Sequence, residues 1–231
     1  ILKISEVDSR FSYISSTQYS SKLTLKKRAL DAGIKSTKYD YMLFTDVDCR
    51  LDPSWVSTMA SSFDQGYDYI VGFSIPKESK GFNVISSFQM IDFSLLMIMC
   101  RASSYFNSPW ASSGQNQGFT KELYNRVGGF ESVNYFIGDD TPFLQLCKKY
   151  GATVGFVDSP LSKVYSRTES KLISFINQRV RWVSDANKLW KLNIPFFLIL
   201  LTTFIFYFEI IIYLFFFEYN FNIILCLLIK S

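Results

Sequence analysis

The 231-residue sequence contains no histidine. This absence excludes catalytic triads, metal sites and general bases that depend on an imidazole, so acid–base chemistry falls mainly to aspartate or glutamate. Cysteine is scarce, and no two cysteines are close enough in sequence to form a CxxC pair: Cys49, Cys100, Cys147 and Cys226. Zinc ribbons and redox motifs are therefore not expected, and the pattern is typical of a protein from a reducing compartment.

A strong excess of charge is also missing, because the net charge is only +4. Lysine and arginine are scattered or lie just before an apolar C-terminal tail, and no basic face interleaved with aromatic residues is present. A nucleic-acid partner is therefore not expected. The length allows one domain of good size, or one domain with an appendage. The sequence begins with Ile1 and has no signal-peptide pattern, and it is expected to start inside a domain.

Two carboxylates follow a short apolar run. Residues 41–44 predict a buried strand, and Asp46 and Asp48 come directly after it. On an extended strand, residues i and i+2 point to the same side, so the two acids would project together from the carboxyl end of the strand. Neighbouring carboxylates repel each other unless a cation lies between them, which favours a hard divalent metal. An Asp-rich turn that closes the strand is the equally weighted alternative.

A second acidic spot occurs at Asp139 and Asp140, immediately before Thr141 and Pro142. Pro142 is typical of the first turn of a helix, so one of the two aspartates is expected at the N-terminus of a helix over residues 142–150. From this local pattern alone, an ordinary N-cap is favoured over a catalytic role.

Further helices and strands are predicted along the chain. Residues 1–21 predict a strand remnant and a loop, and a polar loop over 112–118 leads into a short strand. Helices are predicted over 22–34 with Gly33 as C-cap, 53–63 with Asp52 as N-cap, 82–104 and 121–127, and strands over 67–75 and 152–157.

The C-terminal part is first amphipathic and then strongly apolar. A helix is predicted over 169–189, and Gln178, Arg181 and Trp182 share one of its faces. Taken alone, this pattern is more typical of a surface anchor than of a catalytic site. Residues 194–217 are long and apolar enough to cross a bilayer, and a second apolar run follows at 221–229.

The order and spacing of these motifs together resemble the family 2 inverting glycosyltransferases, in particular membrane-bound members such as cellulose and hyaluronan synthases. The resemblance extends over residues 22–217. It implies the α/β GT-A fold, in which helices flank a mixed sheet, followed by C-terminal transmembrane helices. It also implies a nucleotide-diphosphate sugar donor, for which a UDP-sugar is expected, and a glycan or lipid-linked acceptor.

The resemblance also implies roles for individual residues. Asp46 and Asp48 match the DxD pair that binds the donor and Mg²⁺ or Mn²⁺. Asp140 matches the general base, and Asp139 occupies the acidic position before it. The remaining implied roles are donor binding by Lys26 and Arg181, and acceptor binding by Gln178, Trp182, Gly114 and Asn116.

The resemblance divides the chain into a partial GT-A domain (1–168), an interfacial helix (169–193) and transmembrane segments (194–231). The catalytic domain is expected at the cytoplasmic face of the inner or plasma membrane. Family members carry a nucleotide-gripping strand and turn upstream, for which 1–21 is too short, so these 231 residues are expected to show little or no activity alone. A non-catalytic, membrane-anchored relative remains an alternative. A haloacid dehalogenase-like phosphatase is less favoured, because Arg50 replaces the usual Thr or Val after the second Asp.

Overall fold

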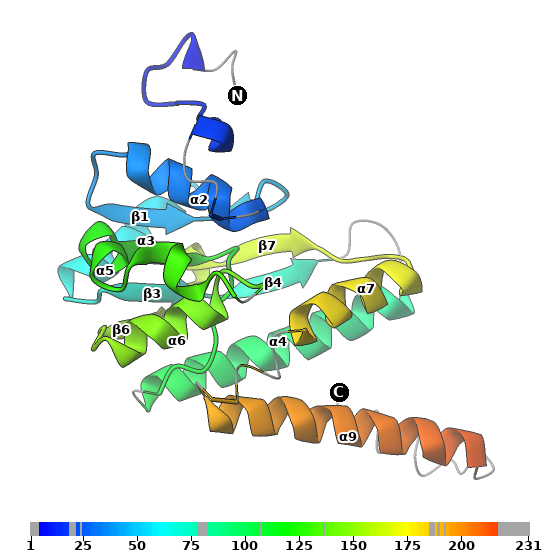
Figure 1. Ribbon diagram of the computed structural model, residues 1–231. Helices are drawn as coiled ribbons and strands as arrows, with labels where there is room; N and C mark the ends of the chain where they lie inside the picture. The colour runs from blue at the N-terminus through cyan, green and yellow to red at the C-terminus, as the bar shows by residue number, and fades with distance from the viewer. Residues whose placement is uncertain are drawn as a thin grey trace.

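The computed structural model describes residues 5–18, 22–23, 25–77, 83–106, 108–135, 137–184, 188, 190–191 and 193–216. These residues form a mixed α/β fold in which helices flank two small β-sheets (Figure 1). The predicted α/β class is therefore confirmed. The second apolar run, residues 221–229, lies outside the described residues.

The larger sheet has the strand order β1-β5-β3-β6, formed by Tyr41–Phe44, Gln117–Thr120, Tyr69–Gly72 and Val154–Val157. β5 runs antiparallel to both neighbours, whereas β3 and β6 are parallel. The smaller sheet has the order β2-β7-β4, formed by Arg50–Leu51, Val164–Arg167 and Ser74–Lys77. In this sheet β7 is antiparallel to β2 and parallel to β4, so both sheets are mixed.

The chain passes from one sheet to the other at Phe73. The sequence predicts one strand over 67–75, but the structure divides this stretch into β3 and β4. The carbonyl of Phe73 accepts a hydrogen bond of 2.9 Å from the amide of Val164, which starts β7 of the smaller sheet. The predicted strand is therefore divided at Phe73, because the backbone before it pairs with β5 and β6 and the backbone after it pairs with β7.

The predicted α-helices are all present, with ends that differ by a few residues. Their bounds are α2 Leu25–Ser36, α3 Trp55–Asp64, α4 Val84–Tyr105, α5 Lys121–Arg126, α6 Thr141–Lys149, α7 Leu172–Val183 and α9 Ile194–Phe216. Three 3-10 helices accompany them: η1 Ser16–Gln18, η2 Gly129–Val133 and η3 Pro160–Ser162. No strand occurs within the described residues 5–18, where a strand remnant was predicted.

Two predicted helix caps are wrong. α2 continues through Gly33 because the amide of Thr37 donates to the carbonyl of Gly33, which extends the helical hydrogen-bond ladder. α3 begins later than predicted, with Ser54 at the N-cap position. Asp52 lies outside that helix and instead accepts a hydrogen bond of 2.8 Å from the amide of Ser54.

The middle of the larger sheet is buried on both faces. Side chains of a strand alternate between the faces, so Tyr69 and Val71 of β3 pack into one hydrophobic cluster and Ile70 packs into another. β1, in contrast, lies at the end of the strand order with Tyr41 exposed, so the prediction of a buried strand there is wrong. Its exposed edge allows the residues that follow it to reach solvent.

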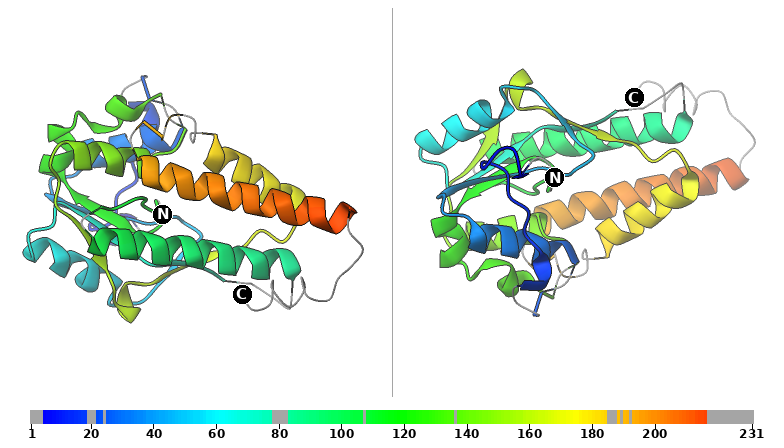
Figure 2. Two further views of the ribbon diagram at one scale, coloured as in Figure 1. Left: turned by 90° about the horizontal axis from the view of Figure 1, so that it is seen from below. Right: turned by 90° about the horizontal axis from the view of Figure 1, so that it is seen from above.

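Three helices extend together away from the sheets: α4, α7 and α9 (Figure 2). Phe88 of α4 joins them, because its ring centroid lies 5.8 Å from that of Phe175 in α7 and 5.6 Å from that of Tyr207 in α9. α9 is also fixed at its start, where Phe196 is buried in the core. α7 and the described part of α9 therefore pack against the rest of the α/β fold.

Within the described residues, α4 is the helix whose length and composition would allow it to cross a membrane, and the apolar stretch Ile194–Glu209 of α9 is shorter. α4 packs against β4 and β6, so it serves as a helix of the α/β domain. The transmembrane segments predicted from residue 194 onward stay a prediction.

Asn116, just before β5, joins the two sheets from a fully buried position. Its Oδ1 accepts a hydrogen bond of 3.0 Å from Trp55 Nε1, and its Nδ2 donates to the carbonyls of Phe73 at 2.8 Å and Ser162 at 2.7 Å. Both N–H donors of the amide are therefore used inside the protein. The structure gives Asn116 a structural role, and its role in acceptor binding stays a prediction.

Replacing Asn116 with alanine leaves the Trp55 Nε1–H group and the Ser162 carbonyl buried without their hydrogen-bond partners, while the Phe73 carbonyl keeps its bond from the amide of Val164. We expect Asn116→Ala to lower the free energy of unfolding by about 2–4 kcal/mol, measured by urea unfolding with circular dichroism. Asn125→Ala, at an exposed position of α5, is the matched control and should change it by less than about 0.5 kcal/mol. Equal effects of the two substitutions would contradict the structural role of Asn116.

Candidate functional site

The carboxyl end of β1 and the amino end of β5 lie at the same edge of the larger sheet, because Phe44 is paired with Gln117 in antiparallel register. Asp46 follows Phe44 and Gly114 precedes Gln117, so both residues leave the sheet at this edge. In open α/β sheets, ligands bind beyond the carboxyl ends of the strands. This edge is therefore where the predicted site residues are expected to meet.

Asp46 and Asp48 lie in a turn and not on a strand. β1 ends at Phe44, and the amide of Cys49 donates to the carbonyl of Asp46 at 3.1 Å, which closes the turn. The argument from strand alternation is therefore wrong, and the alternative of an Asp-rich turn describes the backbone. Asp46 is partly buried, whereas Asp48 is exposed.

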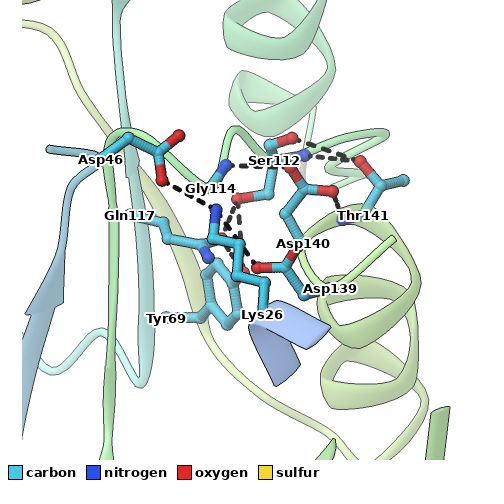
Figure 3. Close-up of polar contacts among 9 residues, drawn as sticks. All are labelled: Lys26, Asp46, Tyr69, Ser112, Gly114, Gln117, Asp139, Asp140 and Thr141. Carbon is cyan, nitrogen blue, oxygen red and sulfur yellow. Dashed lines mark hydrogen bonds and ion pairs between the residues drawn. The ribbon is translucent and has the colours of Figure 1, made fainter. Parts of the chain in front are cut away.

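Lys26 connects two of the acids. Its Nζ lies 2.9 Å from Asp46 Oδ1 and 3.6 Å from Asp139 Oδ2 (Figure 3). The next residue, Lys27, is buried and donates to the carbonyl of Val133 at 3.2 Å. Because successive residues of an α-helix point about 100° apart, anchoring Lys27 in the interior directs Lys26 toward the sheet edge.

Asp140 is the N-cap of α6, as the local pattern predicts. Its Oδ1 accepts a hydrogen bond of 2.7 Å from the amide of Thr141, and its Oδ2 accepts one of 2.9 Å from the amide of Gly114. Thr141 Oγ1 in turn accepts from the amide of Ser112 at 3.2 Å and donates to the carbonyl of Ser112 at 3.3 Å. The loop before β5 is thus fastened to the start of α6.

Gly114 lies between the charged groups. A Cβ atom at this position would lie 3.0 Å from Lys26 Nζ, 3.4 Å from Asp140 Oδ2 and 3.6 Å from Asp139 Oδ2. The absence of a side chain therefore permits the close approach of these groups. We call Lys26, Asp46, Gly114, Asp139 and Asp140 the carboxylate cluster.

The cluster contains one acid with an unusual proton affinity. Asp139 Oδ2 is buried and has no hydrogen-bond partner among the described residues. Burial and the neighbouring Asp140 raise the pKa of Asp139 to about 6, although the Lys26 ammonium opposes this shift. Burial disfavours that ammonium as well, but Asp139, Asp46 and Asp140 outweigh the effect and raise the pKa of Lys26. Asp139 can therefore gain or lose a proton near neutral pH.

The residue types in the turn fit a magnesium or manganese ion. Mg²⁺ is commonly held by one or two carboxylates together with substrate phosphates, and Asp46 and Asp48 supply two carboxylates. The described residues contain no group of three or more His, Cys, Asp or Glu that could form a fuller cage. Lys26 already contacts Asp46 Oδ1. A metal held here would take its remaining oxygen ligands from water or from a bound phosphate.

Gln178 and Trp182 of α7 line a cavity of about 30 Å³. Gln89 and Phe93 of α4 and Gln115 of the loop lie around the same cavity. Gln115 Oε1 and Arg179 Nε are buried without hydrogen-bond partners among the described residues. A hydroxyl group both donates and accepts hydrogen bonds, so it fits a cavity lined by one unpaired acceptor and one unpaired donor.

Some of the predicted site residues lie neither in the carboxylate cluster nor at the cavity beside α7. Arg181 is exposed on α7, and no contact of its side chain with the carboxylate cluster is found in the part of the chain that the structure describes. Asp48 is exposed in its turn, and Asn116 is buried between the sheets. The structure thus joins Lys26, Asp46, Gly114, Asp139 and Asp140, and separately places Gln178 beside Trp182.

Sequence analysis did not select Gln115 and Arg179, although each adjoins a selected residue. Gln115 gave a weak signal, because it lies in the predicted polar loop. Arg179 gave a signal only through its partner, since Asp92 is the sole acidic residue of the largely apolar α4. The fastening residues Ser112 and Thr141 gave no signal that separates them from ordinary turn residues.

Fold and site together define an α/β protein with a charged site at the edge of a mixed sheet, which fits a GT-A-like fold. The model of the glycosyl transferase family group 2 matches residues 41–230, and the chain belongs to this family. No curated protein matches closely enough to be named as a relative. Family membership supports glycosyl transfer and implies a nucleotide-sugar donor and an acceptor.

The raised pKa of Asp139 predicts a pH-dependent effect of its removal. The folded-state pKa of about 6 exceeds the ordinary 3.8, so the stability contributed by proton binding is present below 3.8 and lost as pH rises through 6. We expect Asp139→Asn to raise the free energy of unfolding by about 1–3 kcal/mol at a pH near 7.5, and this gain should vanish near pH 4. Urea titrations at both pH values measure it.

Asp140→Asn is the matched control for this substitution. An amide offers one acceptor oxygen in place of the two that receive backbone N–H groups, so we expect a loss of about 1 kcal/mol near pH 7.5. A gain of the same size in both variants would show that burial of Asp139 is not the cause.

Proposed function

We propose that the chain transfers a sugar, with inversion, from a nucleotide-diphosphate sugar to a hydroxyl group of a glycan or lipid-linked acceptor. The observation that carries this proposal is the convergence of the carboxylate cluster at the edge of the larger sheet. The cluster combines a cation suited to phosphate with an oriented carboxylate suited to proton removal. A UDP-sugar is the proposed donor.

Asp140 is the proposed general base. Inverting transfer requires removal of the acceptor proton while the hydroxyl oxygen attacks the anomeric carbon opposite the leaving diphosphate. Two backbone N–H groups, of Gly114 and Thr141, hold the Asp140 carboxylate in a fixed orientation. The proton passes to this carboxylate as the new glycosidic bond forms. Asp139 beside it retains a proton more readily than an ordinary aspartate, which limits repulsion within the pair.

Lys26, Asp46, Asp48 and Arg181 form the proposed donor side. The ammonium of Lys26 is a suitable donor to phosphate oxygens. Asp46 and Asp48 would hold Mg²⁺ or Mn²⁺, which when bound supplies positive charge to the leaving diphosphate. Arg181 is exposed on α7, and it is proposed to contact the diphosphate in the complex.

The cavity beside α7 is the proposed acceptor side. Trp182 offers a flat apolar face for a sugar ring, and Gln178 lies beside it. Gln115 connects this cavity to the reaction centre, because it follows Gly114 of the carboxylate cluster. The proposed acceptor side and the proposed base are therefore linked through Gln115, which lines the cavity, and Gly114, whose amide donates to Asp140 Oδ2.

We also propose that this protein works at the cytoplasmic face of a membrane. Exposed apolar side chains recur every three or four residues along α4 and α9: Val84, Phe88, Ile91, Leu95 and Ile98, then Ile194, Leu198, Leu201, Ile205, Phe208 and Ile212. Lys188, Trp190 and Lys191 precede α9, and this combination is typical of a membrane interface. A helix that is apolar on all sides but not covered by protein favours a lipid environment.

The function is tested by measuring donor binding and transfer separately. Calorimetry with UDP- and GDP-sugars, with and without Mn²⁺, measures binding to the 231-residue chain, and radiolabelled transfer is followed with the full natural gene product in membranes. We expect Asp140→Asn to reduce transfer about 10²–10⁴-fold while donor affinity stays within a factor of about three.

Asp64→Asn, at an exposed end of α3, is the control and should change neither quantity. Transfer retained by Asp140→Asn would contradict the base assignment. Metal-dependent donor binding without any transfer by the natural protein would favour the non-catalytic alternative.

Membrane attachment predicts a separate result. Leu201→Arg combined with Ile205→Arg places two charges on α9, each costing about 2.5–3.5 kcal/mol at a bilayer centre. We expect this variant to lose flotation with phosphatidylcholine–phosphatidylglycerol vesicles. Val7→Arg with Val56→Arg alters two apolar residues elsewhere that are more exposed than Leu201 and Ile205, and it should leave flotation unchanged. Equal flotation of both variants would contradict attachment through α9.

A further inference from the structure

A row of polar side chains on α4 joins this helix to the segment that contains α7. The row repeats every three residues and begins with the N-cap of α4. Asn83 Nδ2 donates to the Ser170 carbonyl at 3.3 Å, and Ser86 Oγ accepts from Thr168 Oγ1 at 3.0 Å. Gln89 forms two hydrogen bonds with the backbone of Glu169: its Nε2 donates to the carbonyl at 2.7 Å, and its Oε1 accepts from the amide at 3.0 Å. Asp92 lies 2.6 Å from Arg179. The contact between Asp92 and Arg179 is an ion pair, and of the four positions in the row it lies farthest from the N-terminus of α4.

Arg179 is held from two directions. Asp92 Oδ2 contacts one terminal nitrogen of its guanidinium, while the guanidinium carbon lies 4.4 Å from the centre of the Trp182 ring and 5.0 Å from that of Phe175. Phe93, the neighbour of Asp92, contacts the Trp182 ring with a centroid distance of 5.6 Å. Trp182 is therefore contacted by an aromatic ring of α4 and by an arginine that α4 holds in place.

This ion pair is poorly explained by stability alone. Both side chains are 23% exposed, so each loses most of its hydration on folding. Burial lowers the pKa of Arg179, and the attraction of Asp92 does not fully offset this effect. Partly buried ion pairs of this kind often contribute little net stability compared with apolar residues. What the pair does provide is a fixed direction for the guanidinium plane.

We propose that Asp92 and Arg179 are positioning residues that fix the ring of Trp182 as a wall of the cavity beside α7. Asp92 fixes the guanidinium, and the guanidinium stacks on the indole, so a residue of α4 determines where the indole of α7 lies. The relevance of this assignment to acceptor binding rests on the proposed function. The positioning itself is a property of the protein without ligand.

The test measures the exposure of Trp182 in the ligand-free chain. Quenching of tryptophan fluorescence by acrylamide is recorded for each variant and for the same variant with Trp182→Phe, and the difference isolates Trp182 from the other three tryptophans. Trp182 is already 39% exposed, so we expect Asp92→Asn to increase the quenching of Trp182 about 1.5- to twofold as the stacked cation is released. Asp92→Glu keeps the charge and should restore the original value.

Asp158→Asn is the matched control, because Asp158 forms an ion pair with Arg101 of the same helix. It should leave the quenching of Trp182 unchanged. A purely structural pair would lower the unfolding temperature of Asp92→Asn without changing this quenching, and that result would overturn the proposal. An equal increase in Asp158→Asn would overturn it too. The quenching measurement requires no enzymatic turnover. Absence of transferase activity would therefore refute the proposed function, whereas the positioning of Trp182 would still be decided by the quenching result.

Discussion

The arrangement of the site depends on one ammonium group placed among carboxylates. Asp46 comes from the turn after β1 and Asp139 from the start of α6, and their charges would repel each other without Lys26 between them. Lys26 can occupy this position because Lys27 fixes the rotation of α2 and because Gly114 has no side chain. In the proposed function, the phosphate oxygens of the donor would replace the carboxylates as partners of Lys26. The metal ion would replace Lys26 as the positive partner of Asp46.

Sequence patterns predicted the helices well because their periodicity and capping residues are local. Asp140 is an example, since the N-cap geometry follows from its own position before Thr141 and Pro142. Predictions failed where a distant partner decides the backbone. The stretch 67–75 divides into two strands because Val164 pairs with the Phe73 carbonyl. β1 has the predicted bounds of 41–44 but is not buried as predicted, because it lies at the end of the sheet and pairs with β5 on one side. Neither partner can be recognised from the neighbouring sequence.

The same distinction applies to the site. The family resemblance indicated Lys26, Gly114, Asp139 and Asp140, which the structure brings together, because family motifs record tertiary proximity that local patterns do not contain. Gln115 and Arg179 lie within the motif stretches, at positions to which the resemblance assigns no role. Arg179 acquires its place through Asp92, and a lone acid in an apolar helix was the single sequence feature that pointed to such a pairing. Asn116 looked like a loop residue, yet its partners Trp55 and Ser162 make it part of the core.

Two consecutive residues connect the reaction centre to the cavity. The amide of Gly114 holds the carboxylate of Asp140, and the side chain of Gln115 lines the cavity beside α7. Consecutive Cα atoms are about 3.8 Å apart, so a large displacement of the loop backbone at Gln115 would also move Gly114. α4 forms the opposite wall through Gln89 and Phe93 while its outer side presents an apolar stripe. α4 would therefore be in contact with a bound membrane on one side and with the cavity on the other. The cavity is in turn linked to the proposed base, Asp140, through the peptide unit between Gly114 and Gln115.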